Sequence, residues 1–333
     1  MRLAFIGFRH GHVMGLYRGA IEHPKVQVVA ACEDDPQAAA AARAGGVVKL
    51  THDSVDRVFS DVDCDAIAVG DYFARRGELT IRALEAGKHI IADKPLCTRL
   101  DELDRIEQLA AAKKKSIGCL LDLRDHAVYR TMRRLIREAS IGEVHTVLFT
   151  AQHPLNLASR PAWYFEPGKH GGTINDIGIH AIDAIPWLTG RQLTEVTAAR
   201  AWNARLPQHP HFRDAAQLML KLDNNGSAFG DVSYLSPDDL AYSAPQYWRI
   251  TCHGSDGMIE AAYNSKSVSL AAKGDKSPRE ISLDAAAPNG CLEAFMNEIA
   301  GKVEPGALTT ADVIRASRFA LQAQARADEG MLG

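Results

Sequence analysis

The sequence predicts an α/β protein with two domains: a doubly wound parallel sheet, followed by an α+β domain with a large, mostly antiparallel open sheet. At 333 residues the chain is long for one domain. Its first third alternates short apolar runs with helical stretches, a pattern typical of a parallel sheet covered on both faces. From about residue 123 the pattern changes to long strands separated by turns. We therefore expect a first domain over residues 1–122 and a second over 123–333.

The first domain supplies five short apolar runs that we expect to be buried strands. These are "RLAFIG", "VQVVAAC", "DAIAVG", "HIIA" and "SIGCLL", at residues 2–7, 26–32, 65–70, 89–92 and 116–121. Helices are expected between them, at 35–45, over a stretch from 78 that stops at Gly87, and at 101–114. Alternating elements of this kind form a parallel sheet.

The second domain begins with a predicted helix at 126–139 and continues with β patterns. They cover residues 143–153, 193–205, 215–234 and 247–263. The segment "DNNG" (223–226) is a hairpin turn inside the third of these stretches. Consecutive hairpins predict the antiparallel sheet.

Composition excludes several classes of partner. A net charge of −3 gives no general attraction to nucleic acid or anionic lipid, and we find no stretch long enough to cross a membrane. The six cysteines show no Cys-x-x-Cys pair and no metal-ligand spacing; Cys32, Cys119 and Cys252 lie in apolar, strand-like runs. We expect a cytoplasmic protein with no nucleic-acid or membrane partner and no metal.

The loop "GFRHGH" (7–12) follows the first strand, where a dinucleotide fingerprint would read G-x-G-x-x-G. Only Gly7 matches, because Arg9 and His12 stand where the other two glycines belong. By itself this is weak evidence for a cofactor. The helix N-terminus at residues 10–12 nevertheless offers N–H groups to a pyrophosphate, and Arg9 and His10 would add charge-assisted contacts.

The second strand ends in "CEDD" (32–35), where a carboxylate binds the adenosine ribose hydroxyls in dinucleotide-binding folds. Glu33 occupies that position, 21 residues after His12. Asp34 adds negative charge that repels a 2′-phosphate, and no neighbouring arginine is evident to offset it, so we expect NAD rather than NADP. The alternative is that these acids cap the helix starting at Pro36; Asp35 would cap while Glu33 binds.

Two further segments carry chemistry-bearing side chains. In "ADKPL" (92–96), Lys94 directly follows a buried strand and is a candidate to contact a reacting oxygen; the alternative is a surface lysine in a turn. In "NDIGIHAID" (175–183), Asp176, His180 and Asp183 stand at i, i+4 and i+7, on one face of a helix. A solvated face with an Asp–His pair worth about 0.2–0.5 kcal/mol is the competing interpretation.

Two motifs resemble signatures of the glucose–fructose oxidoreductase and inositol dehydrogenase family, Gfo/Idh/MocA. They are "AGKHIIADKP" (86–95), in which Asp93 replaces the usual Glu, and "GGTINDIGIHAID" (171–183). The segments "HGSDGMIE" (253–260) and "CLEAFMNEIAGK" (291–302) extend the resemblance over nearly the whole chain. It implies a Rossmann domain, an α+β domain with an open sheet, and a homodimer or homotetramer formed through that sheet.

The resemblance also implies roles for residues at matching positions. Lys94, Asp176 and His180 match the family's catalytic residues, with Lys94 reaching in from the other domain. Three roles are open for Asp183: a hydrogen bond to His180, contact with a substrate hydroxyl or a structural role. The segment "GDYFARRG" (70–77) departs from the family, with no proline and with Arg76 in place of a histidine.

Candidate binding residues complete the expected site. Arg124 matches a common family arginine near the substrate, and Arg160 and Trp163 come from the polar, aromatic loop 153–172. Trp163 would stack on a sugar or pin the loop. The expected cofactor-binding residues are Gly7, Arg9, His10, His12, Glu33, Asp71, Asp93 and Lys94, and the expected substrate-binding residues are Arg124, Arg160, Trp163 and Asp183.

The function expected from these features is NAD-dependent oxidation of a secondary hydroxyl on a sugar, cyclitol or related polyhydroxylated compound. His180 would act as general base, Lys94 would stabilise the reacting oxygen and Asp176 would orient the substrate or His180. The alternatives are an NAD-assisted glycosidase or lyase with transient oxidation and no net NADH, and a non-catalytic sensor or scaffold with a decayed cofactor site. A metal site at Asp176, His180, Asp183 and His170 is disfavoured. The sequence identifies neither the substrate, the stereochemistry of hydride transfer nor the oligomer size.

Overall fold

The computed structural model describes residues 1–329 and divides the chain into two compact units. The first contains residues 1–121, 168–171 and 289–317, and the second contains 122–167, 172–288 and 318–329. Segments 168–171 and 289–317 thus lie in the first unit, whereas the sequence predicts them in the second domain. The latter segment joins the first unit because Leu292 and Phe295 of α8 (Gly290–Ile299) are buried in its hydrophobic core.

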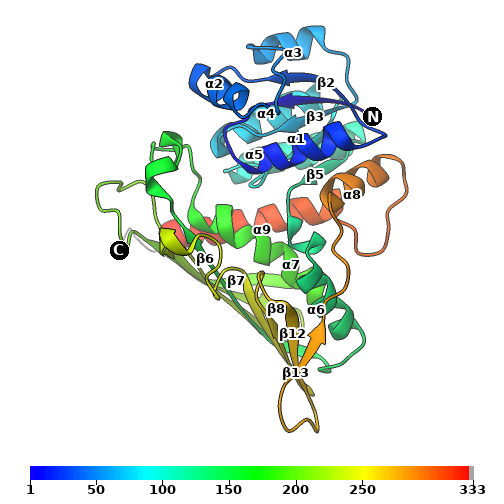
Figure 1. Cartoon of the computed structure of the whole chain (residues 1–333), viewed down its shortest axis with the longest axis vertical. Coiled ribbons are helices and arrows are strands. Elements are labelled where there is room, and N and C mark those ends of the chain that lie inside the picture. Colours follow the sequence, from blue (N-terminus) through cyan, green and yellow to red (C-terminus); the bar gives the residue numbers. More distant parts are fainter. Residues whose placement is uncertain (330–333) are drawn as a thin grey trace. The chain divides into compact units, whose positions relative to one another are not determined.

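The first unit is built on a five-stranded parallel sheet in the order β2-β1-β3-β4-β5 (Figure 1). Every residue of β3 is buried, as expected for a strand covered on both faces. This confirms the predicted parallel sheet. Its strands are β1 (Arg2–Ile6), β2 (Gln27–Cys32), β3 (Ala66–Val69), β4 (His89–Ala92) and β5 (Ile117–Cys119). Its helices include α1 (His12–Glu22), α2 (Pro36–Ala44), α3 (Val55–Asp61), α4 (Phe73–Glu85) and α5 (Leu100–Lys113).

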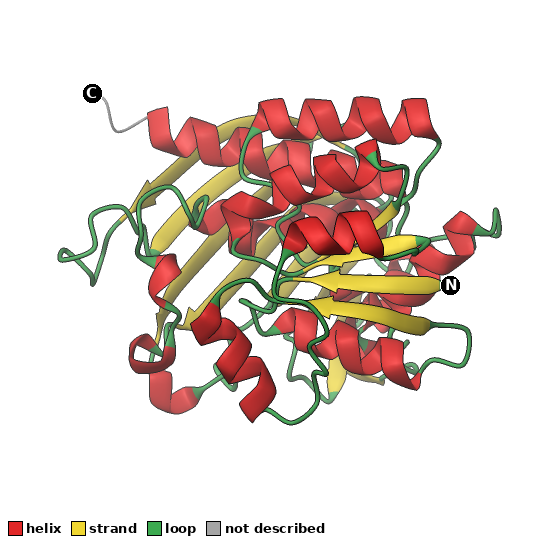
Figure 2. Cartoon of the chain, turned by 90° about the horizontal axis from the view of Figure 1, so that it is seen from above, coloured by secondary structure: helices red, strands yellow, loops and turns green. Residues whose placement is uncertain are grey.

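The second unit contains an eight-stranded sheet in the order β13-β12-β11-β10-β6-β9-β8-β7, whose long strands run side by side in Figure 2. Strands β6 and β9 pair in parallel and the other neighbours pair antiparallel, which confirms the mostly antiparallel sheet. The predicted turn at 223–226 joins β8 to β9. The strands are β6 (Val144–Pro154), β7 (Leu193–Trp202), β8 (Ala215–Leu222), β9 (Ser227–Ser236), β10 (Arg249–Gly254), β11 (Gly257–Ala261), β12 (Ser267–Ala272) and β13 (Arg279–Ser282).

Two helices pack against each other and against this sheet: α6 (Ala127–Arg137) contacts β11 and β12, and α7 (Ile179–Thr189) contacts β6 (Figure 1). A π-helical turn at Ile174–Gly178 precedes α7. The last helix, α9 (Thr310–Glu329), contains the boundary between the units. No helix within residues 1–329 is both long enough and apolar enough to cross a lipid bilayer.

Gly7 makes the turn that leads from β1 to α1. Its φ is +85°, a backbone conformation that residues with a side chain rarely adopt. A Cβ at this position would lie 2.6 Å from the Asp71 amide nitrogen and 2.7 Å from the Asp71 Cα. The ends of β1 and β3 therefore approach each other so closely that only glycine fits.

We expect Gly7→Ala to lower the free energy of unfolding by about 2–4 kcal/mol, because left-handed strain and a backbone clash add together. The matched control is Gly15→Ala in α1, where a Cβ would meet nothing within 4 Å. That variant should gain about 0.5–1 kcal/mol from helix propensity. Urea denaturation followed by circular dichroism measures both, and a Gly7→Ala protein as stable as wild type would contradict this account of the turn.

Candidate functional site

The structure places the residues expected to bind cofactor, with Lys94, in the first unit. It places Asp176, His180 and the residues expected to bind substrate in the second. In the first unit the carboxyl ends of neighbouring parallel strands bring their loops together, as they do at ligand sites in doubly wound sheets.

Glu33 stands at the end of β2 with its side chain fully buried. Its carboxylate accepts hydrogen bonds from the Phe8 amide at 2.7 Å, the Asp35 amide at 2.9 Å and Arg9 Nε at 3.1 Å. Asp35 caps α2 through a bond from the Ala38 amide at 2.8 Å, as expected. Glu33 therefore occupies the position of a ribose-binding carboxylate while the chain's own donors satisfy it.

Two arginines neutralise the neighbouring acids. Asp34 receives Arg9 Nη2 at 2.5 Å and Arg75 Nη2 at 2.6 Å. Asp71 receives Arg75 Nη1 at 2.9 Å and lies 3.3 Å from Arg9 Nε. The hydrogen bond from Arg75 lowers the pKa of Asp34, whereas burial raises the pKa of Asp71 to about 6. The expectation that no arginine offsets Asp34 was wrong, because α4 brings Arg75 beside it from 41 residues away.

Arg76 and Asp93 form a fully buried ion pair, with Arg76 Nη2 3.0 Å from Asp93 Oδ2. The Arg76 guanidinium also donates to the backbone carbonyl oxygens of Asp71, at 2.7 Å, and of Lys94. Burial disfavours a charged Asp93, yet Arg76 and the histidines His10 and His12 hold the pKa of Asp93 well below its ordinary value. Arg76 therefore ties α4 to the loops that follow β3 and β4.

Lys94 follows β4 and is 5% exposed, so the alternative of a surface lysine is wrong. Its ammonium lies 5.8 Å from the centre of the Phe73 ring, at the start of α4. Its backbone carbonyl is held by Arg76. The lysine side chain is thus fixed at the carboxyl edge of the sheet.

Replacing Arg76 by Ala would leave Asp93 buried without its guanidinium, which costs about 3–5 kcal/mol of unfolding free energy. Arg82→Ala on the same helix is the control, because Arg82 pairs with the exposed Asp56 at 2.7 Å; we expect that variant to stay within about 0.5 kcal/mol of wild type. Thermal and urea unfolding measure both variants. Equal stabilities of the two would show that the buried pair does not organise this edge.

In the second unit, Asp176 lies in the π-helical turn and His180 in the first turn of α7. The Tyr234 hydroxyl, on β9, donates a hydrogen bond to Asp176 Oδ2. His180 Nδ1 lies 3.7 Å from Asp122 Oδ1, and the His180 ring packs edge-on against Trp248 with centroids 5.0 Å apart. All three partners come from other elements.

The segment that carries Asp176, His180 and Asp183 is not one regular α-helix. Asp176 lies in a π-helical turn, which holds more residues than an α-helical turn, and the other two residues lie in α7. Asp183 instead forms a two-point ion pair with Arg124, at 2.8 and 2.6 Å, and both side chains are buried. Arg124 and Asp183 therefore neutralise each other, which favours the structural role left open for Asp183.

Arg160 and Trp163 fasten their own loop. Arg160 donates from Nε to the Leu155 carbonyl at 2.7 Å, and its guanidinium lies 4.8 Å from the Tyr164 ring centre. Trp163 is buried, with its ring centroid 4.2 Å from that of Tyr164. These contacts favour the loop-pinning role that the sequence left open for Trp163.

Sequence reasoning missed Asp122, Tyr234 and Trp248. Asp122 stands two residues before Arg124, which the sequence predicts to bind substrate, so its charge was a usable signal. Tyr234 and Trp248 give no such signal in the sequence. Tyr234 reaches Asp176, and Trp248 reaches His180, only because the sheet folds. Trp248 has a left-handed backbone, φ +49°, and its carbonyl accepts a hydrogen bond from the Tyr129 hydroxyl.

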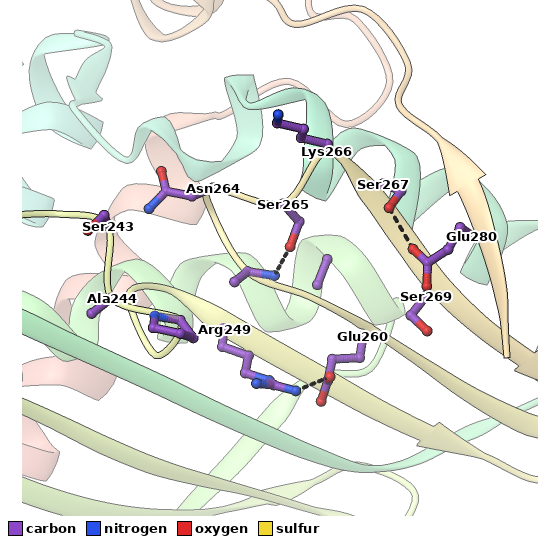
Figure 3. A pocket seen from close by; sticks show the side chains of 13 residues that line it. Ser243, Ala244, Arg249, Glu260, Asn264, Ser265, Lys266, Ser267, Ser269 and Glu280 are labelled. Carbon is purple, nitrogen blue, oxygen red and sulfur yellow. Dashed lines mark hydrogen bonds and ion pairs between the residues drawn. The ribbon is translucent and has the colours of Figure 1, made fainter.

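A separate cavity of about 510 Å³ lies beside β10 to β13 (Figure 3). Three of its charged side chains have partners: Arg249 pairs with Glu260, which also accepts from Thr251 at 2.6 Å, and Glu280 accepts from Ser267 at 2.5 Å. Because these groups satisfy each other, we assign the cavity no chemistry.

The five-stranded parallel sheet and the close glycine turn after β1 are typical of a dinucleotide-binding unit. Comparison with protein families agrees: residues 1–119 match "Oxidoreductase family, NAD-binding Rossmann fold", and residues 129–260 match "GFO/IDH/MocA C-terminal domain". The chain belongs to the GFO/IDH/MocA oxidoreductase family.

Curated relatives include 1,5-anhydro-D-fructose reductase of Ensifer adhaerens, 30% identical over 185 residues and 54% of each chain. Another is scyllo-inositol 2-dehydrogenase (NAD(+)) of Bacillus subtilis, 27% identical over 237 residues, or 66% of this chain and 65% of the relative. These matches span only about half to two thirds of the relatives' length.

Solved structures share the fold over almost the whole chain. The WlbA dehydrogenase of Bordetella pertussis, in complex with NADH and UDP-GlcNAcA, has a TM-score of 0.77 at 17% identity, over 99% of this chain and 97% of that one. Aldose–aldose oxidoreductase of Caulobacter crescentus, complexed with glycerol, has a TM-score of 0.77 at 19% identity, over 99% and 98%. At these identities the likeness establishes the fold alone.

The first unit fits NAD in two respects. Gly7 provides the close approach of backbone to backbone that the first fingerprint glycine provides, and Glu33 stands at the end of β2. Arg9 replaces the second glycine. Its guanidinium forms ion pairs with Glu33 and Asp34 instead of lying at the helix N-terminus. Residues Gly7, Glu33 and the start of α1 would hold the dinucleotide.

Proposed function

We propose that this protein is an NAD-dependent dehydrogenase that oxidises a secondary hydroxyl of a sugar, cyclitol or related polyhydroxylated compound. The observation that carries the proposal is the arrangement around His180: a buried imidazole whose Nδ1 faces a carboxylate, in a chain of the NAD-binding oxidoreductase family. The relatives named for anhydrofructose and inositol support this substrate class.

The chain's own residues divide the work as follows. His180 takes the hydroxyl proton on Nε2, and the charge of Asp122, 3.7 Å from Nδ1, favours the imidazolium that forms. Lys94 stabilises the negative charge that develops on the substrate oxygen. Tyr234 fixes Asp176, which orients the substrate. NAD, when bound, accepts the hydride.

The same proposal includes NAD in preference to NADP. Three carboxylates, of Glu33, Asp34 and Asp71, share two guanidinium groups, of Arg9 and Arg75. The cluster therefore keeps one net negative charge when all its acids are ionised. That charge disfavours the 2′-phosphate of NADP, although less strongly than unpaired acids would.

A screen of polyols, cyclitols and sugar acids with NAD, read as NADH absorbance, tests the activity. We expect at least one compound to give NADH and a ketone product in equal amounts. Product formed without NADH would contradict net oxidation and favour transient oxidation with elimination. The absence of both would favour the non-catalytic alternative.

Once a substrate is found, Lys94→Ala and His180→Ala should each lower kcat by about a hundredfold or more, the scale of losing an oxyanion partner or a general base. His145→Ala, at an exposed position of β6, is the control and should keep the wild-type rate. Circular dichroism verifies that the variants are folded. Wild-type rates in either catalytic variant would remove the mechanism.

We further propose that the protein forms a homodimer or homotetramer through the eight-stranded sheet. Leu148, Met219 and Phe229 are 42%, 43% and 39% exposed, although they lie in the neighbouring strands β6, β8 and β9. Phe229 pairs in register with both Leu148 and Met219. A contiguous apolar row of this kind marks an interaction surface.

None of the six cysteines forms a disulfide, which suits a reducing cytoplasm.

Light scattering at micromolar concentration should give the mass of a dimer or tetramer for the wild-type chain. Phe229→Glu should give monomer, because it places charges in the centre of the apolar row. Leu240→Glu, at a position 45% exposed and outside the sheet strands, should leave the assembly unchanged. A monomeric wild-type protein would refute this surface as an interface.

A further inference from the structure

His10, His12 and Asp93 bring three metal-ligand atoms within 4.8 Å of one another in the first unit. The two histidines stand just before and at the start of α1, and Asp93 follows β4. The histidine rings are edge-on, with centroids 4.5 Å apart. Three side chains from two loops thus converge at one point on the carboxyl edge of the sheet.

The two oxygens of Asp93 have different surroundings. Oδ2 receives Arg76 Nη2 at 3.0 Å and His10 Nδ1 at 2.5 Å. Oδ1 is buried and makes no hydrogen bond within the described chain, although a buried carboxylate oxygen normally has a partner. It lies 3.3 Å from His12 Nδ1. One oxygen is therefore held in place while the other remains available to a ligand.

The distance between Oδ1 and His12 Nδ1 suits a shared metal ion. Zinc binds histidine nitrogen and carboxylate oxygen at about 2.0–2.1 Å in a tetrahedron, whose ligand atoms are therefore roughly 3.3 Å apart. The His12–Asp93 separation of 3.3 Å equals that edge. A ligand atom of His10 lies within 4.8 Å of both and would supply a third position.

A fixed partner holds the Asp93 carboxylate in place. Arg76 orients the carboxylate through the oxygen opposite the metal position, a common supporting contact in metal sites. Its charge, with that of Lys94 nearby, would moderate the affinity.

We propose that His10, His12 and Asp93 form a binding site for one divalent transition-metal ion, with at least one coordination position left open. Two imidazoles and one carboxylate form the ligand set that catalytic zinc sites and mononuclear Fe(II) sites use. The sequence predicts no metal, because the cysteines lack metal-ligand spacing and a metal site around His180 is disfavoured. This site does not depend on the proposed dehydrogenase function.

Calorimetric titration of untagged, chelator-treated protein with Zn²⁺ tests the site, and Co²⁺ absorption reports the coordination geometry. We expect one equivalent to bind with micromolar affinity, and His12→Ala to weaken it by about a hundredfold. The His12 side chain is 46% exposed, so this variant should fold normally. Asp93→Asn should have the same effect, and His52→Ala in the same unit should have none.

Each outcome decides the matter. Saturable binding that is lost in His12→Ala and kept in His52→Ala supports the site. No saturable binding to folded wild-type protein overturns it, as does binding of unchanged strength in His12→Ala, which would be adventitious. The His12→Ala variant is sufficient to distinguish these results, so the test remains valid even if Asp93→Asn does not fold.

Discussion

The buried pair of Arg76 and Asp93 is the interaction on which the first unit's loops depend. One guanidinium, fixed on α4, reaches the backbone after β3 at Asp71, the backbone after β4 at Lys94 and the Asp93 carboxylate. Charges this deeply buried are tolerated only when they are paired and hydrogen-bonded. The pair therefore sets the position of Lys94 and of the histidines that contact Asp93. Its arginine, Arg76, occupies the position where the family resemblance predicts a histidine.

The second unit follows a different principle. Its candidate functional side chains lie on one segment, the π-helical turn and α7, but each contacts a different neighbour. Asp176 is held by Tyr234, His180 faces Asp122 and Trp248, and Asp183 is paired with Arg124. An uncommon turn of this kind often occurs at functional sites. Here it contains Asp176 and directly precedes the helix that carries His180.

The sequence contained most of the fold and only part of the site. The apolar runs that lead to Gly7, Glu33 and Lys94 predicted the parallel sheet and its loops, because strand burial and turn chemistry are local properties. The contacts of Arg75 with Asp34, and of Asp93 with two histidines, join segments 41 and more than 80 residues apart. No periodicity reports such pairs. The packing of α8 in the first unit could not be predicted for the same reason, since a helical pattern does not show which sheet the helix will cover.

The central claim is that the carboxyl edge of the first sheet is a cofactor site, even though Arg9 and Arg75 already satisfy its acids. Dinucleotide binding must then displace or share the Arg9–Glu33 contact, because the ribose hydroxyls compete for the same carboxylate. Calorimetric titration of the purified chain with NAD, and separately with NADP, tests this most directly. The account predicts saturable binding of one NAD per chain and weaker binding of NADP. No binding of either dinucleotide at millimolar concentration would contradict it.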